Sequence, residues 1–147
     1  MFLSEIYELM DAKWIYAGTS YISSAGTVTS NSDGSYTLGT DGTNYAIFNA
    51  STSSSNTNTV YADIGECFEF DLVDYTGSVT LRSNISGGSN RDVNTTWAAN
   101  THYKIEVVDN GVKFNGTLIT FADTGARNFI LRVQNEATFT IKNLMYY

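Results

Sequence analysis

The chain has 147 residues, 14% of them aromatic, with no proline, one cysteine and a formal net charge of −7. This length suits one domain with its own core, and the lone Cys67 excludes a framework of intrachain disulfides. The eight basic residues form no cluster, which excludes nucleic-acid binding and argues against an anionic membrane surface as partner.

The first residues carry the one convincing helical pattern of the chain. Leu3, Ile6 and Met10 recur at the spacing of a helix face. This predicts a short α-helix over residues 1–12, followed by a β domain over residues 13–147. The helix either docks on the β domain, associates with copies of itself as the end of a coiled coil, or is a remnant foreign to the domain.

The N-terminal stretch does not read as a secretory signal peptide. It lacks a basic region and places Glu5 and Glu8 among its apolar residues. No segment approaches the roughly 18 consecutive apolar residues of a membrane span, so we expect no membrane insertion. An extracellular or virion location would then require release by lysis or a longer parent protein, and the sequence leaves both open.

From Trp14 onward the chain has the pattern of short strands separated by polar turns. Alternation of apolar and polar residues marks strands with one buried face, and Gly, Asn and Asp mark the turns. In the first half we predict strands at 14–16, 21–23, 27–30, 35–38, 44–49 and 60–62, with turns at 31–34 and 39–42. The polar run at 51–58 cannot bury apolar surface and is predicted to be an exposed loop.

The second half contains the strongest alternation. Over 67–72 we expect Phe68, Phe70 and Leu72 to face inward, and Cys67, Glu69 and Asp71 to face outward. We predict turns at 74–77 and 135–136, a flexible loop at 85–90, and further strands at 78–82, 91–93, 128–133 and 139–147.

The stretch 101–121, THYKIEVVDNGVKFNGTLITF, is the strongest hairpin signal in the chain. It alternates apolar and polar residues up to Val107. Asn110-Gly111 is then predicted to supply the positive φ angles of a two-residue turn, and Asn115-Gly116 is predicted to turn the chain again.

About ten to twelve short strands at close, regular spacing predict an all-β fold, a two-sheet antiparallel β-sandwich or jelly roll. The hairpin stretch and the final FTIKNLMYY resemble concanavalin A-like and laminin-G-like jelly rolls, such as those of carbohydrate-binding modules and of virus tail-fibre or adhesin heads. The resemblance covers about half of the chain and implies the same sandwich. It does not fix a function, because that fold hosts lectins, binding modules, glycanases and spacers.

The sequence holds no catalytic constellation that we would assign. Neither a Gly-x-Ser-x-Gly elbow nor an HExxH helix is present, and His102 is predicted to be a solvated strand residue. Glu69 and Asp71 lie on one face of one strand, about 7 Å apart. They are the pair that a glycan hydrolase or lyase would use, and with Asp74 they match the acidic strand of some jelly-roll glycanases only in part. We therefore expect no enzymatic activity.

No cofactor is predicted, but a structural calcium ion stays open. Jelly-roll binding modules often hold one, and calcium takes oxygen ligands from loops. The candidate ligands are Asp33, Asp41, Asp63, Asp74 and Asp123. Each is also an ordinary turn residue.

Sugar recognition combines an aromatic platform with planar polar groups that grip hydroxyls. The stretch richest in both gives six candidate ligand-binding residues: Tyr75, Arg82, Arg91, Asp92, Asn94 and Trp97. Alternatively, Trp97 packs in the core and the two arginines pair with Asp71 or Asp92.

These features favour a non-catalytic carbohydrate- or receptor-binding domain, the head of a virus tail fibre or of a surface adhesin. The expected partner is a glycan or cell-surface receptor, and the expected assembly is a homo-oligomer, preferably a trimer formed through the N-terminal helix. The alternative is a structural or interaction sandwich without a small ligand. The sequence names neither the ligand nor the source organism.

Overall fold

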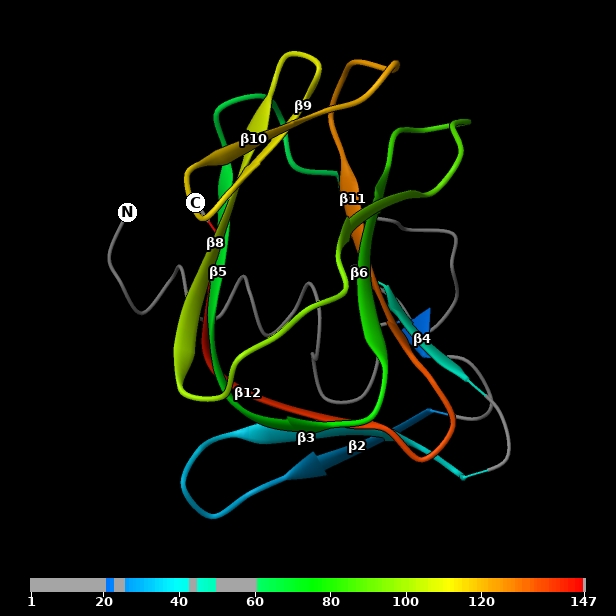
Figure 1. Cartoon of the computed structure of the whole chain (residues 1–147), viewed down its shortest axis with the longest axis vertical. Coiled ribbons are helices and arrows are strands. Elements are labelled where there is room, and N and C mark those ends of the chain that lie inside the picture. Colours follow the sequence, from blue (N-terminus) through cyan, green and yellow to red (C-terminus); the bar gives the residue numbers. More distant parts are fainter. Residues whose placement is uncertain (1–20, 23–25, 43–44, 50–60, 147) are drawn as a thin grey trace.

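The structure, a computed structural model, describes residues 21–22, 26–42, 45–49 and 61–146. The predicted helix over 1–12, the strand at 14–16 and the loop at 51–58 lie outside the described residues. In the described part every regular element is a β-strand, and the strands form two antiparallel sheets (Figure 1). No helix in this part has the length and hydropathy that crossing a membrane requires.

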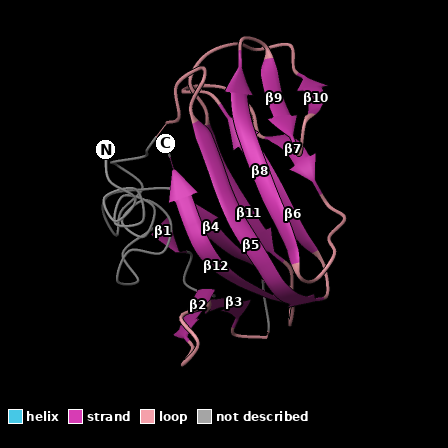
Figure 2. Cartoon of the chain, turned by 90° about the vertical axis from the view of Figure 1, so that its left-hand side faces the viewer, coloured by secondary structure: helices cyan, strands magenta, loops and turns pink. Residues whose placement is uncertain are grey.

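One sheet has five strands: β1 (Tyr21–Ile22), β4 (Ala46–Asn49), β6 (Val79–Asn84), β7 (Arg91–Asn94) and β11 (Asn128–Val133). Their order across the sheet is β1-β4-β11-β6-β7. The other sheet has seven strands: β2 (Gly26–Ser30), β3 (Tyr36–Thr40), β5 (Cys67–Thr76), β8 (Thr101–Val108), β9 (Gly111–Phe114), β10 (Thr117–Thr120) and β12 (Thr138–Tyr146). Their order is β10-β9-β8-β5-β12-β3-β2. Figures 1 and 2 show the two sheets facing each other, with β5, β8 and β12 in one layer and β4, β6 and β11 in the other.

The core lies between the sheets and is built from the alternating apolar residues of each strand. Phe70 and Leu72 on β5, Ile105 on β8 and Leu131 on β11 are completely buried. Burying a side chain of this size contributes about 1.5–3 kcal/mol, so these inner faces supply much of the driving force for folding. The predicted two-sheet antiparallel sandwich is confirmed, as are the inward residues predicted for 67–72.

The predicted turn at 74–77 is wrong, because β5 continues through Thr76. Strand β12 pairs with the extra residues, placing Thr138 opposite Thr76 and Thr140 opposite Asp74. The hydrogen bonds of a neighbouring strand thus override the local turn preference of Asp, Thr and Gly. The predicted turn at 39–42 starts too early for the same reason, since β3 runs to Thr40 between β2 and β12.

The two hairpin turns of the 101–121 stretch differ in their use of glycine. Both loops have two residues, because Val108 pairs with Gly111 and Phe114 pairs with Thr117. In the second loop Asn115 and Gly116 have positive φ angles of 47° and 82°, whereas neither Asn110 nor Gly111 is among the described residues with positive φ. The prediction that Gly111 is needed for a positive φ angle in the turn is therefore wrong. A Cβ atom there would collide with the carbonyl oxygen of Ile119, so glycine permits the close approach of β10.

Gly77, between β5 and β6, combines a positive φ with tight packing. Its φ is 73°, and a Cβ atom would lie 2.9 Å from the Ala137 Cβ. Gly34, between β2 and β3, has a φ of 86° and open space where a Cβ atom would be. The two glycines therefore form a matched pair that separates backbone strain from steric overlap.

We expect Gly34→Ala to lower the free energy of unfolding by about 1 kcal/mol, the cost of a non-glycine residue at positive φ. Gly77→Ala should lower it by about 1–3 kcal/mol more, because it adds overpacking against Ala137. Urea unfolding followed by circular dichroism measures both values. Equal losses in the two variants would contradict the packing argument.

Candidate functional site

The outer face of the seven-stranded sheet carries a polar cluster where β5 lies beside β8. The register pairs Asp71 with His102 and Glu69 with Lys104. All four residues alternate with core residues and therefore share the outer face. The imidazole of His102 lies between the two carboxylates: Nδ1 is 2.7 Å from Asp71 Oδ1, and Nε2 is 3.0 Å from Glu69 Oε1.

This geometry favours the positively charged form of His102. An ionised carboxylate only accepts hydrogen bonds, so each ring nitrogen must donate, which requires an imidazolium. The hydrogen bonds to Glu69 and Asp71 raise the pKa of His102 above its ordinary value, against the opposing effect of burial. The sequence predicts a solvated His102; its side chain is 48% exposed, yet both of its nitrogens are engaged.

Asp71 is held on its other side by β12. Asn143 Nδ2 donates to Asp71 Oδ2 over 2.7 Å. Burial acts to raise the pKa of Asp71, but the hydrogen bonds from Asn143 and His102 and the nearby charges of His102 and Lys142 outweigh it and lower the pKa. Asn143 has a φ of 54°, and the register of β12 with β5 is irregular between Lys142 and Met145. This bulge aims the Asn143 amide at the cluster.

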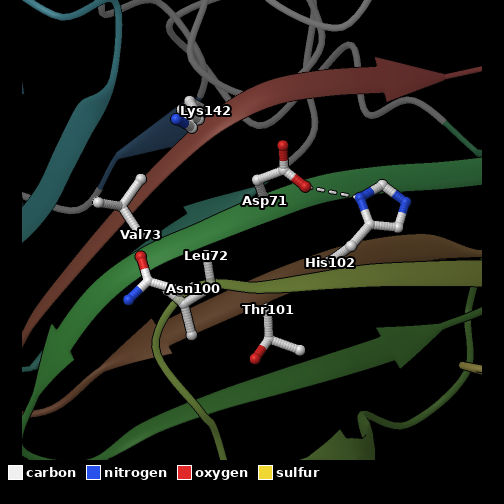
Figure 3. Close-up of a pocket in the computed structure, with 7 residues that line it drawn as sticks. All are labelled: Asp71, Leu72, Val73, Asn100, Thr101, His102 and Lys142. Carbon is white, nitrogen blue, oxygen red and sulfur yellow. Dashed lines mark hydrogen bonds and ion pairs between the residues drawn. The ribbon is translucent and has the colours of Figure 1, made fainter.

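An open depression of about 300 Å³ adjoins the cluster (Figure 3). Its lining residues come from β5, β8, β12 and the loop before β8: Asp71, Leu72, Val73, Asn100, Thr101, His102 and Lys142. They offer a carboxylate, an amide, a hydroxyl, an imidazolium and an ammonium group around one hollow. Such groups donate and accept hydrogen bonds in the directions that a polyhydroxylated ligand presents.

The same geometry argues against hydrolysis by Glu69 and Asp71. A glycosidase places its two carboxyl groups on opposite sides of the scissile bond, one of them free to give up a proton. Here both carboxylates belong to one strand and are bound to the same imidazole, and the Glu69 side chain is only 11% exposed. Both are therefore bonded to His102 from one side and are not placed on opposite sides of a bond to be cleaved.

Of the six sequence-predicted binding residues, four lie together on the five-stranded sheet: Arg82 on β6, and Arg91, Asp92 and Asn94 on β7. Arg82 pairs with Asp92 over 3.0 Å, in agreement with one of the predicted pairings. Arg91 instead pairs with Asp123 over 3.4 Å. The Asn94 amide donates to the carbonyl of Thr96.

The two predicted aromatic residues lie elsewhere. Tyr75 belongs to β5, in the other sheet, and is half-buried against the core. Trp97 is only 6% exposed; its Nε1 donates to Val79 O over 2.8 Å, and its ring packs edge-on against Tyr103 and Phe139. The structure thus places Trp97 in the core, the alternative considered for it, and does not bring the six residues into one site.

The carboxylate of the candidate calcium ligand Asp123 is paired with two arginine side chains. It accepts hydrogen bonds from the fully buried Arg127 and from Arg91, and the bond to Arg127 is the main cause that lowers its pKa. Asp33 accepts hydrogen bonds from the side chain and backbone of Ser35. Within the described ranges no group of three or more His, Cys, Asp or Glu side chains is arranged to hold a metal ion.

No protein-family model matches the sequence, and no curated protein matches it. Solved structures of a family 29 carbohydrate-binding module do match the fold. The structure of a point mutant of a family 29 carbohydrate-binding module matches this chain with a TM-score of 0.53 and 15% sequence identity, over 83% of this chain and 76% of that one. The structure of another mutant, in complex with cellulohexaose, matches with a TM-score of 0.50 and 13% sequence identity, over 83% of this chain and 75% of that one. The fold is thus the jelly-roll sandwich found in carbohydrate-binding modules, as the resemblance of the sequence implied.

The His102 cluster predicts a pH-dependent contribution to stability. Because the pKa of His102 is raised in the folded state, its contribution is fully present below the unfolded pKa of about 6.5 and is lost as the pH rises through the folded pKa. Because the pKa of Asp71 is lowered, its contribution is lost only as the pH falls below about 3.8 and passes through the folded pKa.

We therefore expect the stability advantage of the wild type over His102→Gln to be larger at pH 5.5 than at pH 9. The change should be about 0.5 kcal/mol, since a half-exposed pair is screened by solvent. Urea unfolding at the two pH values measures it. His102 is the only histidine of the chain, so an NMR titration reports its pKa directly, and a pKa at or below 6.5 would contradict the bridging of both carboxylates by a charged imidazolium.

Proposed function

We propose that the chain is a non-catalytic carbohydrate-binding domain, with its glycan site in the depression beside Asp71 and His102. The observation that carries this proposal is the set of planar polar groups held in place by one another: Asp71 is fixed by His102 and Asn143. Groups that are already oriented lose little entropy when they bind neighbouring hydroxyls. The likeness in fold to a carbohydrate-binding module solved with cellulohexaose supports the same class of ligand.

We further propose that the domain is the receptor-binding head of a virus tail fibre or a surface adhesin, outside the cell or on the virion. Its partner would be a glycan of a cell surface. The amphipathic pattern of residues 1–12 supports a homo-oligomer, with a trimer preferred. A fold that needs no disulfide supports assembly before release from a reducing compartment.

The glycan site could lie on the outer face of either sheet, and one matched pair of variants distinguishes the two locations. Asp71 lies on the seven-stranded sheet and Asp92 on the five-stranded sheet, and each is bonded to a cationic side chain. The change of aspartate to asparagine therefore has the same chemistry at both positions. The predicted residues Arg82, Arg91 and Asn94 would act with Asp92 if the second face were the site.

We expect the purified chain to bind specific glycans on an array widened with microbial cell-wall polysaccharides. Asp71→Asn should weaken that binding about tenfold or more, since a hydrogen bond to a charged group contributes about 1.5–3 kcal/mol. Asp92→Asn should leave it unchanged. Circular dichroism melts confirm that both variants fold.

The opposite result, a loss only in Asp92→Asn, would move the site to β6 and β7. A folded wild-type protein that binds no glycan would contradict the proposed function and favour a structural or interaction role.

A further inference from the structure

The basic side chains of the described residues are divided between the two sheets by type. The arginines belong to the five-stranded sheet or to the loop before β11: Arg82, Arg91, Arg127 and Arg132. Each has a partner, because the first three form ion pairs with Asp92 or Asp123 and Arg132 lies over the Tyr45 ring at 4.3 Å. These arginines therefore stabilise their own side of the sandwich.

The lysines of the described residues all lie on the outer face of the seven-stranded sheet. Lys142 is on β12, Lys104 on β8 and Lys113 on β9, and all three are exposed. In the strand register, the residue directly opposite Lys142 is Asp71, the one opposite Lys104 is Glu69 and the one opposite Lys113 is Glu106. We call these three residues the lysine track.

The lysine track runs diagonally across four neighbouring strands, β12, β5, β8 and β9. Lys142 lies opposite Asp71, which in turn lies opposite His102 on β8. Lys104 is two residues beyond His102 on β8, and Glu106 is two residues beyond Lys104. Lys113 on β9 lies opposite Glu106. With about 4.8 Å between strands and about 3.3 Å per residue, the track is about 20 Å long. This length exceeds what a single sugar unit could occupy.

A second depression of about 300 Å³ lies at the far end of the track, lined by Lys104, Glu106, Lys113 and Gly116. The first depression, beside Asp71 and His102, contains Lys142 at the near end. The outward residues of β8 contribute to both, since His102, Lys104 and Glu106 follow each other on one face. A ligand that fills both depressions must be an extended chain.

The local charge differs from that of the whole molecule. The chain carries a net charge of −7, whereas on this face three lysines and His102 stand beside the three carboxylates of Glu69, Asp71 and Glu106. Asp33 adds a fourth carboxylate close to Lys142. Two of these carboxylates are bound to His102. With His102 protonated, this face is therefore close to neutral on an otherwise acidic protein, so it repels an anionic ligand less than the rest of the molecule does, and its exposed lysines can contact that ligand.

We infer that the ligand is an extended acidic polysaccharide, whose carboxylates meet the lysine track while its hydroxyls meet the Asp71–His102–Asn143 cluster. This inference rests on the proposed function and specifies the ligand class of the same site. Lysine suits this task because its flexible stem carries a compact charge to carboxylates of varied spacing. A neutral glycan would gain little from three ammonium groups.

The test measures binding of polygalacturonate, alginate and hyaluronate, each compared with its carboxyl-reduced form, by isothermal titration calorimetry at low and high salt. We expect at least one acidic polymer to bind more tightly than its reduced form, and added salt to weaken it. Lys104→Gln combined with Lys113→Gln should weaken that binding about tenfold, at about threefold for each exposed charge.

Arg82→Gln combined with Arg132→Gln is the matched control, because it removes two positive charges from the other sheet. It should change the affinity less than about twofold. Equal affinity for acidic and reduced polymers, or equal losses in the two double variants, would overturn the inference. Binding of neutral glycans alone would also overturn it but leave the proposed function standing, whereas binding of no glycan at all would contradict both.

Discussion

The double pairing of β5, with β8 on one side and β12 on the other, is the constraint on which the rest of the structure depends. Side chains alternate between the two faces of a strand, so a slip of one residue would exchange the core for the surface. In the observed register Phe70 and Leu72 are completely buried while Asp71 faces His102. The same hydrogen bonds therefore set the core and the candidate site.

The candidate site uses charged groups that neutralise one another. Two carboxylates held close together on one face repel, and His102 between Glu69 and Asp71 offsets that repulsion when its imidazole is protonated. The Asn143 amide satisfies the remaining Asp71 oxygen. The outcome is a hydrogen-bonded polar surface on β-strands, which position binding groups more accurately than loops do.

The two sheets use their cations differently, and the chemistry of the side chains explains the division. Arginine presents a planar fork that suits fixed partners, such as Arg127 buried against Asp123 and the Phe121 ring. Lysine keeps a hydrated charge on a flexible stem, and the described lysines are exposed on one face. The described arginines are thus engaged by partners on their own side of the sandwich, and the described lysines lie exposed on the outer face of the other sheet.

The sequence by itself determined the all-β class, the inward and outward faces of 67–72 and the hairpins of 101–121, because alternation and turn chemistry are local. It also placed Glu69 and Asp71 on one face. Only the tertiary structure decided that His102 joins them, that β5 extends through Thr76 and that Trp97 lies in the core. These outcomes depend on which strands become neighbours and in which register, and residues 31 positions apart, such as Asp71 and His102, carry no local signal of their pairing.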